Sequence, residues 1–263
     1  MSNSVLLRFA NEEMIYLLRA LQITDFPGLD PEPLKNMADS EKSLLMMAAD
    51  HALRARGLIR WQGETEREVD PFVARVLLAC ARPRYTLFID MRDSQLLHIF
   101  GPETIVEQCE PEPQVQQYLV MASWEDFSTR LQSLLTHKYG NGSVPLPGGQ
   151  ISRDLWVEAL SVAQTDSAWA NALLNRSLPP QTANALLAIL HDPQQIQYLA
   201  LWKQTPAAGQ SAPIAALTIV VGHNQLILLH QDSPDTPLLE VIPASAEQAW
   251  EHVTRMLSLA RVP

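Results

Sequence analysis

The chain has 263 residues, of which 47% are hydrophobic and 18% charged, and 19 Lys and Arg stand against 29 Asp and Glu for a net charge of −10. This composition is typical of a folded protein of one large or two small domains, and it excludes collagen-like and disordered classes. Because the chain is acidic and has no Lys/Arg run, we expect neither nucleic acid nor an anionic membrane surface as a partner.

Two further features indicate a cytoplasmic protein. Cys80 and Cys109 have neither CxxC nor metal-ligand spacing, which favours reduced interior thiols. No stretch approaches the about 18 apolar residues of a membrane span, and the N-terminus lacks the pattern of a secretory signal.

The first 139 residues predict helices, then a strand meander, then a closing helix. Asn11 is expected to cap the first helix, Ser40 to begin the second and Asp70 to cap the third. The face predicted for the second helix is lined by Leu44, Met47, Ala48 and His51. The helices expected are 11–21, 40–57, the one that follows the Asp70 cap and stops at Pro83, and 124–137. The strands expected are 85–92, 95–100, 104–109 and 115–121.

The second part of the chain predicts the same order of elements. Residues 140–150 are rich in Gly and Pro and favour a linker between repeats at 1–139 and 151–263. Gly222 is expected to open a tight hairpin, and Ser245 to cap the last helix. The helices expected here are 152–162, 167–176, 182–190 and the one after Ser245, and the strands are 197–204, 216–222, 225–231 and 237–242.

Matches in a common order indicate that the two parts are repeats of one unit. The matched stretches are His51–Leu58 with Asn171–Leu178 at an offset of 120, Phe72–Pro83 with Thr182–Pro193 at 110, and Glu103–Leu135 with Gln225–Leu257 at 122. We therefore expect an α+β fold in which two halves related by a pseudo-twofold axis share a central antiparallel sheet flanked by helical bundles, as one compact domain. Two unrelated α+β halves of similar composition are the alternative.

The motifs of common catalytic, metal and nucleotide sites are missing from the sequence. The seven histidines are scattered, and none has a carboxylate or cysteine at ligand spacing, so we expect no metal, no cofactor and no enzymatic activity. One alternative is a winged-helix transcriptional regulator that offers Arg54, Arg56 and Arg60, although acidic residues follow closely. The other is an enzyme whose site is assembled from scattered residues.

Charge is scarce in the second half of the chain. Residues 1–139 hold 34 charged side chains, whereas residues 140–263 hold 14. Within the second half, Leu217–Val221 and Leu226–Leu229 are apolar at every position except Thr218, so both faces of these strands need a cover. The helices of the same half are one cover; the other is the opposite half, a second subunit or a bound partner.

The order of elements and several local stretches resemble the EspG family, the cytosolic chaperones of type VII secretion. The stretches are Ala52–Leu58, Val69–Phe72, Leu77–Pro83 and the strands from Tyr85 to Glu110. The resemblance implies a non-enzymatic protein that holds the apolar tip of a helical secretion substrate until export. The connection Gly101–Glu103 is shorter than the substrate-contacting loop of those chaperones, and the longer loop here is Thr205–Pro213.

Our hypothesis for the binding site joins this loop to the apolar strands. We expect Trp202, Leu226, Leu228 and His230 to form an apolar groove for a partner helix or for a second subunit in a homodimer. On this hypothesis Leu228→Asp abolishes association and leaves the fold intact. Unfolding of that variant would instead place these strands in the core.

Overall fold

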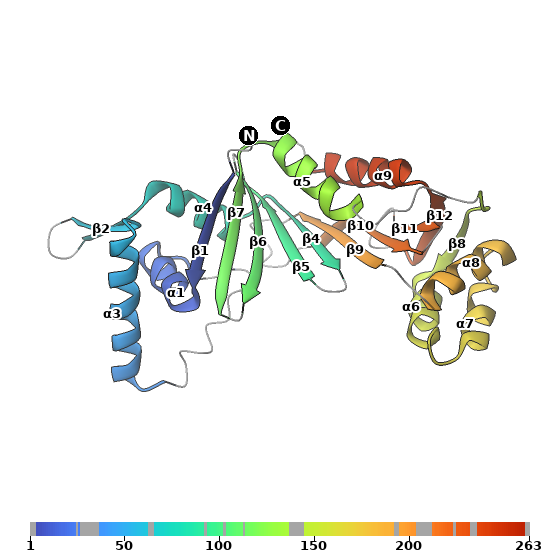
Figure 1. Cartoon of the computed structure of the whole chain (residues 1–263), viewed down its shortest axis with the longest axis horizontal. Helices are drawn as coiled ribbons and strands as arrows, with labels where there is room; N and C mark the ends of the chain where they lie inside the picture. Colours follow the sequence, from blue (N-terminus) through green and yellow to red (C-terminus); the bar gives the residue numbers. More distant parts are fainter. Residues whose placement is uncertain are drawn as a thin grey trace. The chain divides into compact units, whose positions relative to one another are not determined.

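A computed structural model of the chain describes residues 4–24, 26, 37–62, 66–91, 94–101, 104–112, 114–136, 145–191, 195–203, 212–222, 225–231 and 236–260. The first half contains β1 (Val5–Ala10), α1 (Asn11–Ala20), α3 (Asp39–Ala55), β2 (Ile59–Gln62), β3 (Glu66–Val69), α4 (Pro71–Ala81), β4 (Tyr85–Met91), β5 (Ser94–Phe100), β6 (Ile105–Glu112), β7 (Val115–Met121) and α5 (Trp124–Thr136) (Figure 1).

The second half contains β8 (Gly149–Ser152), α6 (Arg153–Val162), α7 (Ser167–Leu174), α8 (Pro180–His191), β9 (Gln195–Lys203), β10 (Ala212–Val221), β11 (Leu226–Gln231), β12 (Leu238–Ala244) and α9 (Ala246–Ser258). Apart from the hairpin β2–β3, the described elements of both halves run strand, three helices, four strands, helix. This parallel order is what the repeat predicts.

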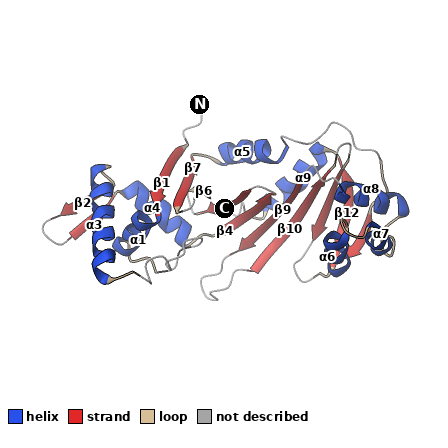
Figure 2. Ribbon diagram, turned by 60° about the horizontal axis from the view of Figure 1, so that its bottom comes forward, coloured by secondary structure: helices blue, strands red, loops and turns tan. Residues whose placement is uncertain are grey.

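Ten of the described strands form one sheet in the order β1-β7-β6-β5-β4-β9-β10-β11-β12-β8, and β2 and β3 pair with each other in a separate sheet (Figure 2). In each half the strand that precedes the helices takes the edge position, and the described pairs are antiparallel. The predicted α+β class with a shared antiparallel sheet is confirmed. The chain divides into two compact units, one of residues 1–84 and 97–127 and one of residues 85–96 and 128–263.

Local chemistry repeats as well. Ser123 Oγ accepts from the Asp126 N–H at 3.1 Å, and Ser245 Oγ accepts from the Gln248 N–H at 3.2 Å, so both predicted serine caps are present, 122 residues apart. The predicted hairpin at Gly222 also forms, because its N–H donates to the Gln225 carbonyl at 2.9 Å.

Each unit has its own hydrophobic core. In the first, residues of α1, α3 and α4 pack against one face of β6 and β7 through side chains such as Leu17, Leu53, Leu77 and Tyr118. In the second, residues of α6, α7 and α8 pack against one face of β10, β11 and β12. Among the described residues, no helix combines the length and apolarity needed to cross a membrane.

Some boundaries differ from the sequence predictions. Ala10 occupies the N-cap position of α1, its N–H bonded to Glu13 at 3.1 Å, and Asn11 is the first helical residue. The short edge strands β1 and β8 and the hairpin β2–β3 were not predicted, and β8 begins inside the expected linker. Residues 140–144 of that linker and residues 205–211 of the expected loop lie outside the described part; β10 already begins at Ala212.

The two cysteines have different surroundings. Cys80 is fully buried in α4, and burial raises the pKa of its thiol to about 12. Cys109 is only partly buried, and its Sγ accepts from Gln117 Nε2 at 3.4 Å. The interior placement predicted for both therefore holds fully for Cys80 alone.

Candidate protein-binding face

Strand β11 is covered on both faces by helices of its own unit. Ile227 and Leu229 belong to the core formed with α6, α7 and α8. His230 lies on the opposite face, where its ring centroid is 5.7 Å from that of His252 in α9. Figure 1 shows α9 on one side of β10–β12 and α6–α8 on the other. The two covers required by the apolar pattern are therefore both intramolecular.

The structure does not bring the four predicted site residues together. Leu226 and Leu228 share a face with His230 and are 6% and 0% exposed. Trp202 lies in β9, and the strand register puts it on the opposite face of the sheet, the face of Ile227 and Leu229. Of the four, only Trp202 and His230 keep an accessible part. A role of the four in partner binding stays a prediction.

Trp202 belongs to a partly open face of β4, β9 and β10, all within the second unit. The opposite face of these strands is almost completely buried, with Leu87, Ile89, Leu199 and Leu217 at 0–1% exposure. On the open face, by contrast, Phe88 and Trp202 are partly exposed and Tyr198 is 38% exposed. We call this surface the open face; its residues are Thr86, Phe88, Asp90, Tyr198, Ala200, Trp202, Ala216 and Thr218.

Large and small side chains are ordered on the open face. The rings of Phe88 and Trp202 meet edge to face, with centroids 6.2 Å apart. Ala200 is paired with Phe88 on one side and with Ala216 on the other. Tyr198 is paired with Asp90 and Thr218. Of the two alanines, Ala200 is 0% exposed and Ala216 is partly exposed, so the apolar surface that a partner could reach is formed mainly by the three aromatic rings.

A polar group on this face lacks a partner. The hydroxyl of Thr86, directly opposite Trp202, is buried and makes no hydrogen bond within the described part of the chain. A buried hydroxyl without a hydrogen bond is unfavourable for stability.

Sequence reasoning missed Phe88 and Tyr198. Tyr198 could have been found from its spacing to Trp202, because residues four apart in one strand lie on the same face. The neighbour of that strand was not foreseeable, because the pairing of β4 with β9 joins segments more than a hundred residues apart.

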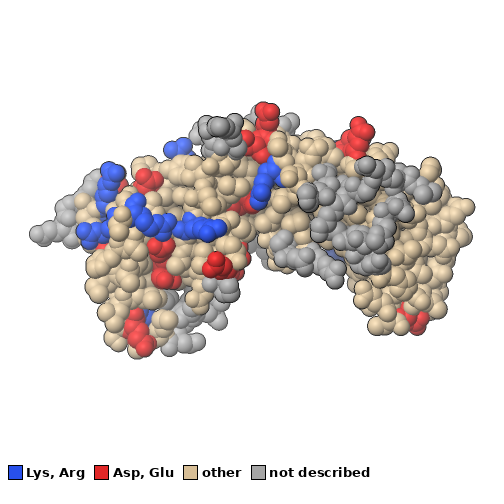
Figure 3. Space-filling view, in the orientation of Figure 1, with Lys and Arg blue, Asp and Glu red and all other residues tan. Residues whose placement is uncertain are grey.

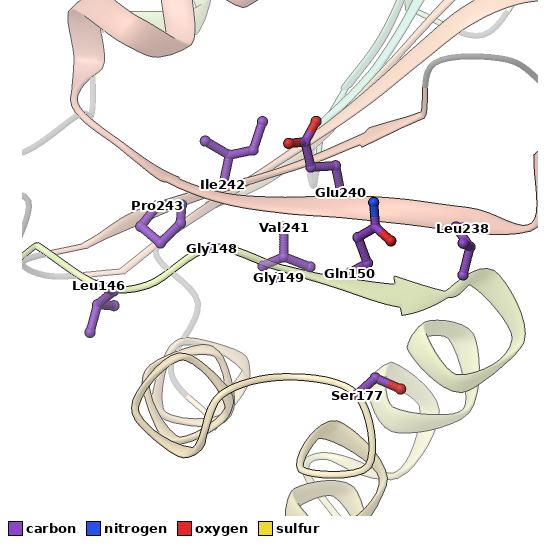
Figure 4. A pocket seen from close by; sticks show the side chains of 10 residues that line it. All are labelled: Leu146, Gly148, Gly149, Gln150, Ser177, Leu238, Glu240, Val241, Ile242 and Pro243. Carbon is purple, nitrogen blue, oxygen red and sulfur yellow. The ribbon is translucent and has the colours of Figure 1, made fainter.

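A depression of about 770 Å³ lies at the β8–β12 edge (Figure 4). It is lined by Leu146, Gly148, Gly149, Gln150, Ser177, Leu238, Glu240, Val241, Ile242 and Pro243. Glu240 is the only titratable group in this lining, and Ser177 has no base beside it there. The lining therefore lacks the acid–base or nucleophile–base pair that catalysis needs.

Titratable groups at hydrogen-bond distance occur elsewhere and are structural. His98 Nε2 is 3.1 Å from Glu107 Oε2, but these side chains are 0% and 2% exposed and closed off from substrate. Tyr16 donates to Asp50 between α1 and α3, and burial, together with this bond, raises the pKa of Tyr16 to about 12. Among the described residues, no three of His, Cys, Asp and Glu gather closely enough to hold a metal ion.

The arginines considered for DNA binding are partly engaged. Arg56 bonds both carboxylate oxygens of Glu13 at 3.0 Å and the Arg8 carbonyl at 2.8 Å. Arg54 is 3.6 Å from Asp50, and Arg60 is exposed. Figure 3 shows Lys and Arg gathered on the visible side of the first unit, whereas the visible described surface of the second unit is mostly uncharged. The charge scarcity seen in the sequence of the second half is thus also visible on this side of the second unit.

The pair His230–His252 predicts a pH dependence of stability. Burial lowers the pKa of His252 below its ordinary value of 6.5; His230 and Arg255 lower it further, whereas Glu240 and Glu251 raise it. The unfolded state therefore binds more protons as the pH falls through about 6.5, and the stability that neutral His252 contributes is lost on acidification.

We expect the free energy of unfolding to fall between about pH 7.5 and pH 5.5, and His252→Gln to flatten this fall. Urea denaturation at stepped pH measures both. His191→Gln, at an exposed histidine of α8, is the control and should leave the slope unchanged. Identical slopes for wild type and His252→Gln would contradict the prediction.

No protein-family model and no curated protein matches this sequence. A solved structure does match: the Mycobacterium tuberculosis type VII secretion system chaperone EspG5, in complex with a PE25-PPE41 dimer. The match covers 96% of each chain with a TM-score of 0.69 at 13% identity. The chain has an EspG-like fold. This confirms the resemblance predicted from the sequence, and at 13% identity the EspG-like fold is what the comparison shows.

Proposed function

We propose that this chain is a non-enzymatic, cytoplasmic chaperone of the type VII secretion kind that holds a helical protein partner on its open face. The observation that carries the proposal is the open face itself: three partly exposed aromatic side chains on strands β4 and β9, whose opposite face is almost completely buried at Leu87, Ile89 and Leu199. The EspG-like fold supports it, because the matching EspG5 chaperone was solved with a protein dimer bound.

The chemistry of the open face suits a helix. Aromatic residues dominate the energy of protein interfaces, and an amphipathic helix binds by placing its apolar stripe against such a surface. Ala216 is partly exposed on the same face, so a partner's leucine or methionine can pack on it as well as on the aromatic rings. Asp90, which is partly exposed, supplies a polar group beside the aromatic side chains, and this group helps to fix the register of a bound helix.

The test uses the full chain, tagged, to capture partners from a cytosolic extract of the source organism and from co-expression with small helical secreted proteins encoded beside its gene. Mass spectrometry identifies the captured proteins. Trp202→Ala should weaken capture about 30-fold, the effect of removing a tryptophan worth about 2 kcal/mol from an interface.

The matched control is Trp61→Ala, at a tryptophan of β2 that is 36% exposed and lies over the Arg67 side chain. It should leave capture unchanged, and both variants should keep the wild-type circular dichroism. Equal capture by wild type and Trp202→Ala, or capture of no helical secreted protein, would overturn the proposal.

A further inference from the structure

Strand β8 lies at one end of the sheet order, and its outer edge carries unpaired backbone groups. It pairs with β12, and beside this ladder the Arg153 N–H donates to the Pro237 carbonyl at 2.8 Å. Because backbone groups alternate between the two sides of a strand, this bond places the Gly148 C=O, both backbone groups of Gln150 and the Ser152 N–H on the outer side. Within the described part of the chain, these four groups make no hydrogen bond.

The edge strand of the first half, β1, is closed by side chains of its own unit. The Arg8 carbonyl accepts from Arg56 at 2.8 Å, and the Ala10 N–H is bonded to Glu13 at 3.1 Å. Such bonds prevent a further strand from pairing, and other exposed edges are blocked by charged residues or proline. None of the four residues of β8 is charged or proline. The contrast between two equivalent strands indicates that the edge of β8 is available to a partner.

The depression beside β8 has its apolar and acidic side chains in a regular order (Figure 4). Leu238, Glu240 and Ile242 stand at alternate positions of β12, and Glu240 is the register partner of Gln150, so all four share one face. Leu238 and Glu240 are exposed, and Ile242 is partly exposed. Glu240 forms no ion pair with any described residue. An apolar, acidic, apolar row therefore lies next to the unpaired backbone groups.

We propose that this edge binds an extended segment of a protein partner as an additional strand, with a Lys or Arg of that segment beside Glu240. An extended chain matches the alternating donors and acceptors of the edge, whereas a helix satisfies its own backbone groups internally. The basic residue is chosen by Glu240 and by the nine acidic against five basic residues of 140–263, which attract a cationic segment. The edge shares no residue with the open face, and binding there does not depend on the proposed function.

The side chains of β12 also predict the pattern of the bound segment. The Lys or Arg lies opposite Gln150, in line with Glu240, and the residues two positions to either side point to the same face, in line with Ile242 and Leu238. Gly148 has no side chain, which leaves the way to Ile242 free. We therefore expect a basic residue with an apolar residue two positions before it and another two positions after it.

Selection of linear peptides of about ten residues from a random phage-displayed library, on the immobilised full chain, tests the proposal. Enriched peptides should share the expected pattern, and synthetic copies should bind in fluorescence anisotropy. Gln150→Pro should weaken this binding at least about tenfold, because it removes the outward N–H and places a ring at the edge. Glu240→Gln should weaken it about threefold. Gln150→Ala keeps the N–H and is the matched control; it and Trp202→Ala should bind as wild type does.

Amide hydrogen exchange of the wild-type chain reads the geometry without a substitution. A bound peptide should slow exchange of the Gln150 and Ser152 N–H groups at least about tenfold, whereas the Ile151 N–H, which already points to β12, should change little. Enriched peptides without the pattern, equal binding by wild type and Gln150→Pro, or unchanged exchange at Gln150 would each overturn the proposal. Self-association that Gln150→Pro abolishes would also overturn it, because a second copy would then be the occupant.

Discussion

Leu228→Asp is expected to unfold the protein rather than to release a partner. Leu228 is 0% exposed in β11, between Ile219 of β10 and Ile242 of β12 in the strand register. An aspartate there loses the packing of the leucine and buries a carboxylate with no cation beside it in the register, together more than about 5 kcal/mol. That exceeds half of the stability of many domains.

The measurement is urea denaturation of purified chain followed by tryptophan fluorescence. Leu238→Asp is the control, because Leu238 belongs to the neighbouring strand β12 and is 44% exposed. It should change the free energy of unfolding by less than about 1 kcal/mol. A Leu228→Asp chain with a wild-type transition would show that β11 does not form part of the core, and would restore the groove hypothesis based on the sequence.

The burial of Leu228 shows that an apolar strand pattern predicts a buried strand but not the elements that cover it. The run from Leu226 to Leu229 correctly predicted a strand that needs two covers. It did not determine which covers are present, because α6–α8 and α9 are brought to the two faces by contacts distant in sequence. Placing Trp202 and Leu228 in one site failed for a related reason: their faces depend on the register across β10.

Local signals were more dependable than long-range ones. Asp70 caps α4 as predicted, because its side chain accepts from the Phe72 and Val73 N–H groups at 3.0 and 3.1 Å. Gly57, with a φ of 71°, follows the C-cap residue Arg56 at the end of α3. The edge strands β1 and β8 were not predicted, because strands of six and four residues are too short to show a clear alternation of apolar and polar residues. The face of α3 predicted to pack inward is exposed at Leu44 and Met47, because apolar spacing identifies a face without showing what covers it.

Glu107→Ala should destabilise the first unit by about 3 kcal/mol. Glu107 and His98 are register partners on β6 and β5, both are almost completely buried, and their side chains are 3.1 Å apart. The His98 ring also lies 5.2 Å from the Phe127 ring of α5, and its Nδ1 makes no hydrogen bond within the described residues. Removing the carboxylate deprives the buried Nε2 of this partner as well.

The double variant His98→Leu/Glu107→Leu separates the pair from its surroundings. It removes both polar groups and keeps apolar volume, so it should recover most of the stability that Glu107→Ala loses, because a buried polar pair contributes less than the penalty of breaking it. Glu112→Ala, at an exposed position of β6, should change stability by less than about 0.5 kcal/mol. A double variant less stable than Glu107→Ala would instead show that the two groups are held by further polar contacts that leucine cannot replace.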